Sequence, residues 1–149
     1  MDNLRLADRS WPLLRRLMRV HVALYRVTDG RIGRRMPGLP PMLLLEHVGA
    51  KTGKRYTTPL VYMEDGDDFV VVGSKGGHPQ HPGWVHNLRA VPDAEVQVGA
   101  RRIEVRAREA TPDERRRLWP RVVAHNPRWG RYQQRTERTV PLVVLRPSV

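Results

Sequence analysis

The chain has 149 residues, 27 basic against 15 acidic side chains for a formal net charge of +12, and no cysteine. Its length suits a single domain over residues 1–149, the lack of cysteine excludes disulfides, thiol nucleophiles and thiolate metal sites, and the charge favours acidic partners such as phosphorylated cofactors, nucleic acid or an anionic membrane. The cytoplasm is the expected compartment, because no apolar stretch near the N-terminus has the length of a secretory signal.

The N-terminal segment, residues 1–28, is predicted to form a basic amphipathic helix. Between about Asp8 and Val27 the apolar face recurs at helical spacing through Leu14, Leu17, Val20, His21, Leu24 and Val27. Packing of this helix on the rest of the domain is the favoured interpretation. The alternative is that residues 8–27 lie on an anionic membrane, at its inner face. Residues 29–41 follow as a connector rich in glycine and proline.

Two predicted strands, residues 42–48 and 55–63, enclose the segment Gly-Ala-Lys-Thr-Gly-Lys at 49–54. The segment superficially resembles a phosphate-binding Walker A loop, which has four residues between its glycines and Ser or Thr after the lysine. Here three residues separate Gly49 from Gly53, Arg55 follows Lys54, and the segment joins two strands. Nucleoside triphosphatase chemistry is therefore excluded, and a basic hairpin that can contact phosphate remains.

An acidic turn at 64–68 leads into a predicted strand at 69–72 and then into Gly-Ser-Lys-Gly-Gly at 73–77. Paired glycines let backbone N–H groups converge on an anion, and a helix entered through Pro82 would add its positive end. A phosphate cradle and a plain polar turn explain this segment equally well on its own. All three lysines of the chain, Lys51, Lys54 and Lys75, fall in these two glycine-containing turns, where a compact point charge would suit phosphate or carboxylate.

The second half begins with a predicted hairpin of strands 94–98 and 102–110. Thr111, Pro112 and Glu114 form a capping box that starts a helix with Leu118, Trp119, Val122 and Val123 on its buried side. A break at 126–130, a short helical piece and a strand at 140–145 complete the chain. Six strands in hairpin-like order with peripheral helices favour an α+β fold, mainly antiparallel β, built as a small closed or nearly closed barrel over residues 42–149.

The histidines at 78, 81 and 86 are close in sequence, but no metal site is predicted from them. A loop broken by prolines offers no fixed helical face, and no acidic residue accompanies the histidines. Loop polarity or contact with a cofactor is the preferred interpretation.

Four motifs, taken in their order and spacing, carry a family resemblance. They are Gly-Ala-Lys-Thr-Gly-Lys followed by Thr57-Thr58-Pro59-Leu60, Gly73-Ser74-Lys75-Gly76-Gly77, His81-Pro82-Gly83-Trp84 with His86-Asn87-Leu88, and Arg138-Thr139-Val140-Pro141. From about Val27 to its C-terminus the chain resembles the deazaflavin-dependent nitroreductase and quinone reductase family, which uses the reduced coenzyme F420. The resemblance implies a split β-barrel with the coenzyme in an open groove. Tyr56 stands where family members usually carry arginine, and the basic residue is displaced to Arg55.

The resemblance also implies a set of site residues. The phosphate and acidic tail of F420 would meet Lys51, Lys54 and Arg55. The deazaflavin ring would lie near Thr58, Pro59, Ser74, Lys75, Gly76 and Gly77, in a groove lined by Pro82, Trp84 and Asn87. Trp129 and Tyr132 would contact the substrate. Tyr132, and after it Ser74, are the candidates for orienting or protonating an acceptor oxygen, because a hydroxyl can donate to an oxygen that gains negative charge.

The expected function is hydride transfer from reduced F420 to a hydrophobic acceptor such as a quinone, a nitroaromatic or an enone, without a metal. Two alternatives stay open. One is a basic nucleic-acid-binding barrel, ranked lower because the few aromatic residues do not interleave with a basic strand face, so that no nucleic acid partner is expected. The other is a carrier that binds F420 without catalysis.

Overall fold

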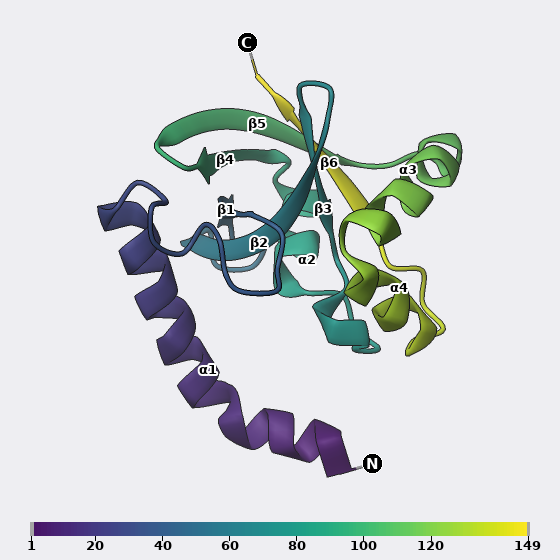
Figure 1. Cartoon of the computed structure of the whole chain (residues 1–149), viewed down its shortest axis with the longest axis horizontal. Coiled ribbons are helices and arrows are strands. Elements are labelled where there is room, and N and C mark those ends of the chain that lie inside the picture. Colours follow the sequence, from purple (N-terminus) through teal and green to yellow (C-terminus); the bar gives the residue numbers. More distant parts are fainter. Residues whose placement is uncertain (1, 149) are drawn as a thin grey trace.

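The computed structural model describes the backbone of residues 2–148 and the side chains of residues 12–148. Its helices and strands follow one another in the order shown in Figure 1. They are α1 (Asp2–Val27), β1 (Met42–Val48), β2 (Arg55–Asp65), β3 (Asp68–Val72), the short 3₁₀ helix η1 (Lys75–Gly77), α2 (Gly83–Ala90), β4 (Asp93–Val98), β5 (Arg101–Glu109), α3 (Pro112–His125), α4 (Pro127–Gln134) and β6 (Leu142–Pro147).

The six strands form a closed barrel in the order β1-β2-β3-β6-β5-β4, and every neighbouring pair is antiparallel. The last strand, β6, inserts between β3 and β5, pairing Val70 with Val144 on one side and Ala107 with Leu145 on the other. Pairing of β1 with β4 closes the barrel, so no strand is left with an open edge. The predicted barrel of six mainly antiparallel strands is thus confirmed. That residues 1–149 form a single domain stays a prediction.

The barrel has one hydrophobic cluster inside and a second on its outer surface. Side chains alternate along a strand, so Val71 and Leu145 belong to the inner cluster and Val70 and Val144 to the outer one. Helices α3 and α4 cover the outer cluster, on the right of the barrel in Figure 1. This double burial explains why 69–72 and 142–145 are uninterrupted apolar runs. Helix α2 closes one end of the barrel with Trp84, Val85 and Leu88, which join the inner cluster.

Several predicted boundaries were displaced, and one local motif is confirmed. The break expected at 126–130 is a single residue, because Asn126 caps α4 by accepting from the Arg128 N–H and Pro127 already starts that helix. The last strand begins at Leu142 rather than at 140, since the Val140 N–H bonds the side chain of Gln133 instead of a strand. Pro82 precedes α2 as its N-cap. The capping box at Thr111 is present as expected.

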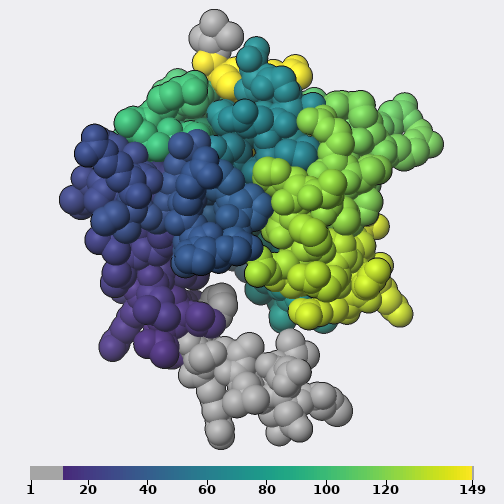
Figure 2. Space-filling view, in the orientation of Figure 1, coloured from purple at the N-terminus to yellow at the C-terminus, as the bar shows by residue number. Residues whose placement is uncertain are grey.

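Helix α1 is attached to the barrel mainly at its C-terminal end. Tyr25 is fully buried, and its hydroxyl donates to the Met42 carbonyl at 3.0 Å and accepts from the Gly99 N–H at 2.9 Å. Arg26 pairs with Glu46 at 2.5 Å on the outside of β1. The preceding turns extend away from the barrel, and the described part of α1 stands clear of α4 in Figure 2. None of the helices in residues 2–148 combines the length and hydropathy needed to cross a bilayer.

Candidate functional site

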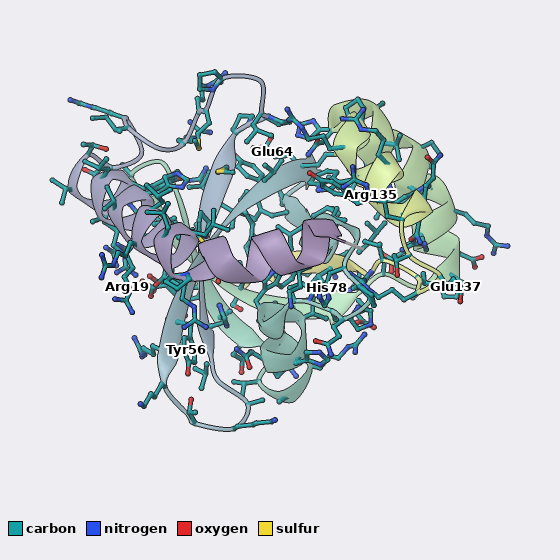
Figure 3. The ribbon with its side chains drawn as sticks, turned by 90° about the horizontal axis from the view of Figure 1, so that it is seen from below. Arg19, Tyr56, Glu64, His78, Arg135 and Glu137 are labelled. Carbon is teal, nitrogen blue, oxygen red and sulfur yellow. The ribbon has the colours of Figure 1, made fainter. Side chains whose placement is uncertain are left out.

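Both lysine-bearing bends lie next to α2, at the end of the barrel that this helix closes. Viewed from below in Figure 3, Tyr56 marks the β1–β2 hairpin on one side of α2 and His78 marks the loop before α2 on the other. Asn87 of α2 accepts a hydrogen bond from the backbone N–H of Ala50 in the hairpin at 2.9 Å. The loop at 73–82 runs directly into α2. Helix α2 is therefore bonded to the first bend and continuous in the chain with the second.

The hairpin at 49–54 is a tight turn that presents three cations. Two backbone hydrogen bonds close it, from Gly49 N–H to the Lys54 carbonyl and from Gly53 N–H to the Gly49 carbonyl, and Gly53 has a φ of 68° that suits glycine. The cations Lys51, Lys54 and Arg55 are all exposed, and within residues 12–148 none of them pairs with a carboxylate. Their charge is available to an anion from solution.

The loop at 73–77 has an unusual backbone, because three consecutive residues lie in the left-handed region. Their φ angles are 46° for Lys75, 62° for Gly76 and 80° for Gly77. Glycine adopts this region freely, whereas Lys75 is held there at a cost. The Lys75 side chain is exposed, and Ser74 is 8% exposed with a hydroxyl that makes no capping bond. A strained, well-held loop with a free hydroxyl is typical of a binding site.

Arg138 holds this loop, a role that the sequence analysis missed. Its Nε donates to the His78 carbonyl at 2.8 Å, its Nη1 to the Gly73 carbonyl at 3.1 Å and its Nη2 to the Ser74 carbonyl at 2.8 Å. Nη1 also donates to Nδ1 of His81 at 2.9 Å. Burial and the nearby charge of Arg138 lower the pKa of His81. The signal in the sequence is the Arg-Thr-Val-Pro motif, one of the four motifs that carry the family resemblance.

Helix α4, which carries the predicted substrate residues Trp129 and Tyr132, packs against the same loop. A Cβ atom placed on Gly77 would lie 2.8 Å from the carbonyl oxygen of Tyr132, so the two backbones are in direct contact. Tyr132 is partly buried beneath Arg135, whose guanidinium carbon lies 5.5 Å from the ring centre. Trp129 is only 5% exposed and stacks on His125 in the outer cluster. Tyr132 is therefore more accessible to a substrate than Trp129.

A buried histidine that the sequence analysis left aside links the hairpin, β2 and α2. His47 is 5% exposed, with Nδ1 at 3.0 Å from Asn87 Nδ2 and Nε2 at 2.9 Å from the Thr58 hydroxyl. Burial lowers the pKa of His47 to about 4, so the ring is neutral at pH 7. Tyr56 stacks on it with ring centres 5.9 Å apart. Strand alternation was the available signal, because His47 follows Leu43 and Leu45 on the inner face.

The remaining predicted residues fall into different environments. Thr58 pairs with Leu45 and shares its inward direction, whereas Pro59 pairs with Leu44 and points to the other face. Pro82 is buried. Trp84 is 6% exposed and packs in the inner cluster, so its contacts are those of a core residue. The roles inferred from the family resemblance for all these positions stay predictions.

Two hollows on the surface lie beside this end of the barrel. One of about 250 Å³ is lined by Val85, Leu88 and Arg89 of α2 and by β5, and one of about 440 Å³ includes His47, Arg55 and several carboxylates of β4 and β5. Neither hollow includes Lys51 or Lys75. Over the described residues no group of three His, Asp or Glu side chains is arranged to hold a metal ion.

Comparison with known proteins gives consistent matches. The family model described as F420H(2)-dependent quinone reductase matches residues 17–147. An F420H(2)-dependent quinone reductase of Mycobacterium tuberculosis is 51% identical over 132 residues, which cover 87% of this chain and 89% of the relative. The solved structure of an F420-H2 dependent reductase is 36% identical, with a TM-score of 0.65 over 70% of this chain and 93% of that one. Another solved chain, described as a domain-swapped dimer, is 32% identical, with a TM-score of 0.67 over 85% and 96%.

Proposed function

Because the chain belongs to the F420H(2)-dependent quinone reductase family, we propose that it transfers a hydride from reduced F420 to a quinone or to a similar hydrophobic, electron-poor acceptor. The family resemblance inferred from the motifs is confirmed, and with it the use of F420 by an oxidoreductase. Nitroaromatics and enones are further acceptors that we propose on chemical grounds, since each can take a hydride and then a proton. The observation that carries the proposal is the pair of lysine-bearing bends beside α2.

The residues present suit an anionic coenzyme. Four exposed cations, Lys51, Lys54, Arg55 and Lys75, have no carboxylate partner within residues 12–148. Lysine and arginine bind phosphate and carboxylate through charge-assisted hydrogen bonds. We therefore propose that the hairpin cations hold the phosphate and acidic tail, and that Thr58, Pro59, Ser74, Gly76 and Gly77 surround the ring.

When bound, reduced F420 supplies the hydride, and the chain supplies orientation and local charge. We propose that the Tyr132 hydroxyl binds the acceptor oxygen and donates to it as negative charge develops, and that the Ser74 hydroxyl holds a second oxygen or the ring. Packing of α4 on the 73–77 loop places these two residues on neighbouring elements. Trp129 would pack behind the substrate-contacting residues rather than contact the substrate itself, since it is buried in the outer cluster.

The proposal is tested by mixing the purified protein with reduced F420 and menadione and following the absorbance of the coenzyme. We expect oxidation of F420 that depends on both protein and quinone. Absence of binding, or of turnover with any of the three acceptor classes, would contradict it. Binding followed by no oxidation in stopped-flow experiments would instead favour the F420 carrier. Binding of random oligonucleotide with comparable affinity and steep salt dependence would favour the nucleic-acid alternative.

The contribution of Lys75 is tested separately. Lys75→Ala removes a charge-assisted contact and should weaken F420 binding by about 1–3 kcal/mol in a fluorescence titration. Arg146→Ala is the matched control, because Arg146 is exposed and pairs with Asp68 in β3. Equal affinities for the Lys75 variant, the control and the wild type would remove Lys75 from the site.

Helix α1 supports a second proposal, that the protein works in the cytoplasm at the inner face of an anionic membrane. Leu13, Leu17 and Val20 are 61%, 57% and 56% exposed, so one face of α1 is apolar and unpartnered within the described chain. The arginines at 16 and 19 are also exposed. An amphipathic helix of this composition binds the headgroup region of anionic lipid, and a lipid-soluble quinone would be found there.

Co-sedimentation with vesicles tests this second proposal. Replacing Leu13, Leu17 and Val20 together by Ser should release the protein from vesicles containing anionic lipid, while the distant Arg146→Ala control should leave binding unchanged. Wild-type protein that stays in the supernatant would refute the membrane proposal. A second copy of the chain is the competing occupant of this face, and sedimentation velocity of the same variants would detect its loss.

A further inference from the structure

A single row of hydrogen bonds crosses the end of the barrel from the basic hairpin to Thr58. The N–H of Ala50 donates to Asn87 Oδ1 at 2.9 Å, Asn87 Nδ2 lies 3.0 Å from His47 Nδ1, and His47 Nε2 lies 2.9 Å from Thr58 Oγ1. The four residues come from the hairpin, α2, β1 and β2. His47 shares the inward direction of Leu45 on β1, and Thr58 is paired with Leu45, so the side chains of His47 and Thr58 lie on the inner face.

The direction of every bond in this row is fixed by its first member. A backbone N–H can only donate, so the oxygen of the Asn87 amide faces Ala50 and the NH₂ group faces His47. Nδ1 of His47 must then accept and carries no proton. A neutral imidazole keeps its one proton on the other nitrogen, so Nε2–H donates to the Thr58 hydroxyl.

This direction determines how the Thr58 hydroxyl can bond. Its oxygen already accepts from His47, and no acceptor for its own proton is found within the described chain. This proton is therefore free to donate to a ligand that lies beside Thr58. The hydroxyl can donate this proton to a ligand atom that accepts a hydrogen bond, and the bond from His47 leaves it one lone pair instead of two.

We propose that His47 is a positioning residue for F420, which fixes Thr58 as a hydrogen-bond donor to an acceptor atom of the coenzyme and ties this donor to the basic hairpin through Asn87. This inference rests on the proposed function, because it needs the coenzyme to lie beside Thr58. His47 itself need not contact the coenzyme. Its burial and its neutral state keep the direction of the row constant across the neutral pH range.

A double-mutant cycle on coenzyme affinity tests the inference. Thr58→Val should raise the F420 dissociation constant roughly five- to tenfold, the effect of one lost hydrogen bond. His47→Phe should raise it by a similar factor, and the double variant should lose no more than the larger single effect, because both changes remove the same donor. Thr57→Val is the matched control, since the Thr57 hydroxyl accepts from Arg26 outside the barrel. Its affinity should equal that of the wild type.

A role of His47 in packing alone predicts a different pattern, in which the two losses multiply in the double variant. That result would overturn the inference. His47→Gln offers a rescue, because its side-chain NH₂ can still donate toward Thr58, and it should recover most of the affinity lost in His47→Phe.

The tautomer gives a readout that does not need the coenzyme. Nitrogen NMR of the His47 ring should show Nε2 protonated and Nδ1 bare, and Asn87→Asp should reverse this by placing an acceptor against Nδ1. A wild-type ring with its proton on Nδ1 would refute the row. These readouts also separate two failures: wild-type protein without affinity for F420 overturns the proposed function together with this inference, whereas bound F420 with a multiplicative cycle overturns the inference alone.

Discussion

Arg138 offers the sharpest test of how the coenzyme loop is held. Arg138→Ala removes four hydrogen bonds at once, to the carbonyls of Gly73, Ser74 and His78 and to Nδ1 of His81. These partners span the whole bend between β3 and α2. The variant should therefore leave the barrel intact and release the segment that carries Ser74 and Lys75.

The magnitude follows from the number and kind of these bonds. A hydrogen bond from a charged donor contributes about 1.5–3 kcal/mol, so four independent bonds would contribute about 6 kcal/mol or more. Arg138 is only partly buried, so water can replace some of the lost donors, and bonds from one guanidinium are not independent. We expect about 3 kcal/mol, or roughly a hundredfold increase in loop opening. Arg138→Lys keeps the charge and one or two of the contacts and should lose about half as much.

Hydrogen exchange measured by mass spectrometry separates the loop from the rest of the molecule. Residues 73–81 should exchange roughly a hundred times faster in Arg138→Ala while the strands keep their protection, and F420 affinity should fall at least tenfold. Arg146→Ala is the control, since among residues 12–148 its exposed guanidinium pairs with Asp68 and should contribute about 0–1 kcal/mol. Uniform faster exchange across the barrel, or no change in the loop, would refute the assignment of Arg138 to the loop.

Three further predictions concern stability and the loop. The pKa of His47 is about 4 in the folded chain instead of 6.5, so between these pH values the unfolded chain binds a proton that the folded chain does not. The free energy of unfolding should therefore fall by up to about 3 kcal/mol as pH drops from 6.5 to about 4. In urea titrations, His47→Gln should show a smaller decrease over the same pH range. Gly77→Ala should impair F420 binding more than Gly76→Ala, since both have positive φ but only Gly77 abuts Tyr132, and equal losses would contradict that contact. Thr111→Ala should lower the urea midpoint by the equivalent of about 1 kcal/mol, and an unchanged midpoint would show the capping box to be dispensable.

Patterns of local spacing predicted the strands and the capped helix α3, because alternation and capping depend on neighbouring residues. The same information failed where distant partners decide. Val140 is apolar and fits a strand pattern, but its N–H donates to the Gln133 side chain, and β6 begins only at Leu142. The extra burial of Trp84 also depends on α2 closing the barrel, which no local pattern reveals.

The candidate site divides in the same way. Glycine and lysine in the two bends identified its anion-binding parts, since these residues determine local backbone shape and charge. The residues that hold the bends, Arg138 and His47, were missed because each bonds a partner 40 or more residues away in the chain, Ser74 for Arg138 and Asn87 for His47. A polar residue on the predicted inner face of a strand indicates a buried hydrogen-bonding role, and His47 is such a residue. Its partners, however, follow only from the strand register and the position of α2.

Helix α2 connects the stability of the core to the geometry of the site. Its inward residues Trp84, Val85 and Leu88 are 6%, 1% and 4% exposed and are fixed by packing against the barrel interior. Asn87 lies on the same helix, so its amide is positioned by that packing rather than by the hairpin it bonds. A flexible basic hairpin alone would have to lose conformational entropy to bind an anion, and the Ala50–Asn87 bond removes part of that loss before binding. The hydrophobic plug of the barrel thus serves as the rigid support on which both bends are arranged.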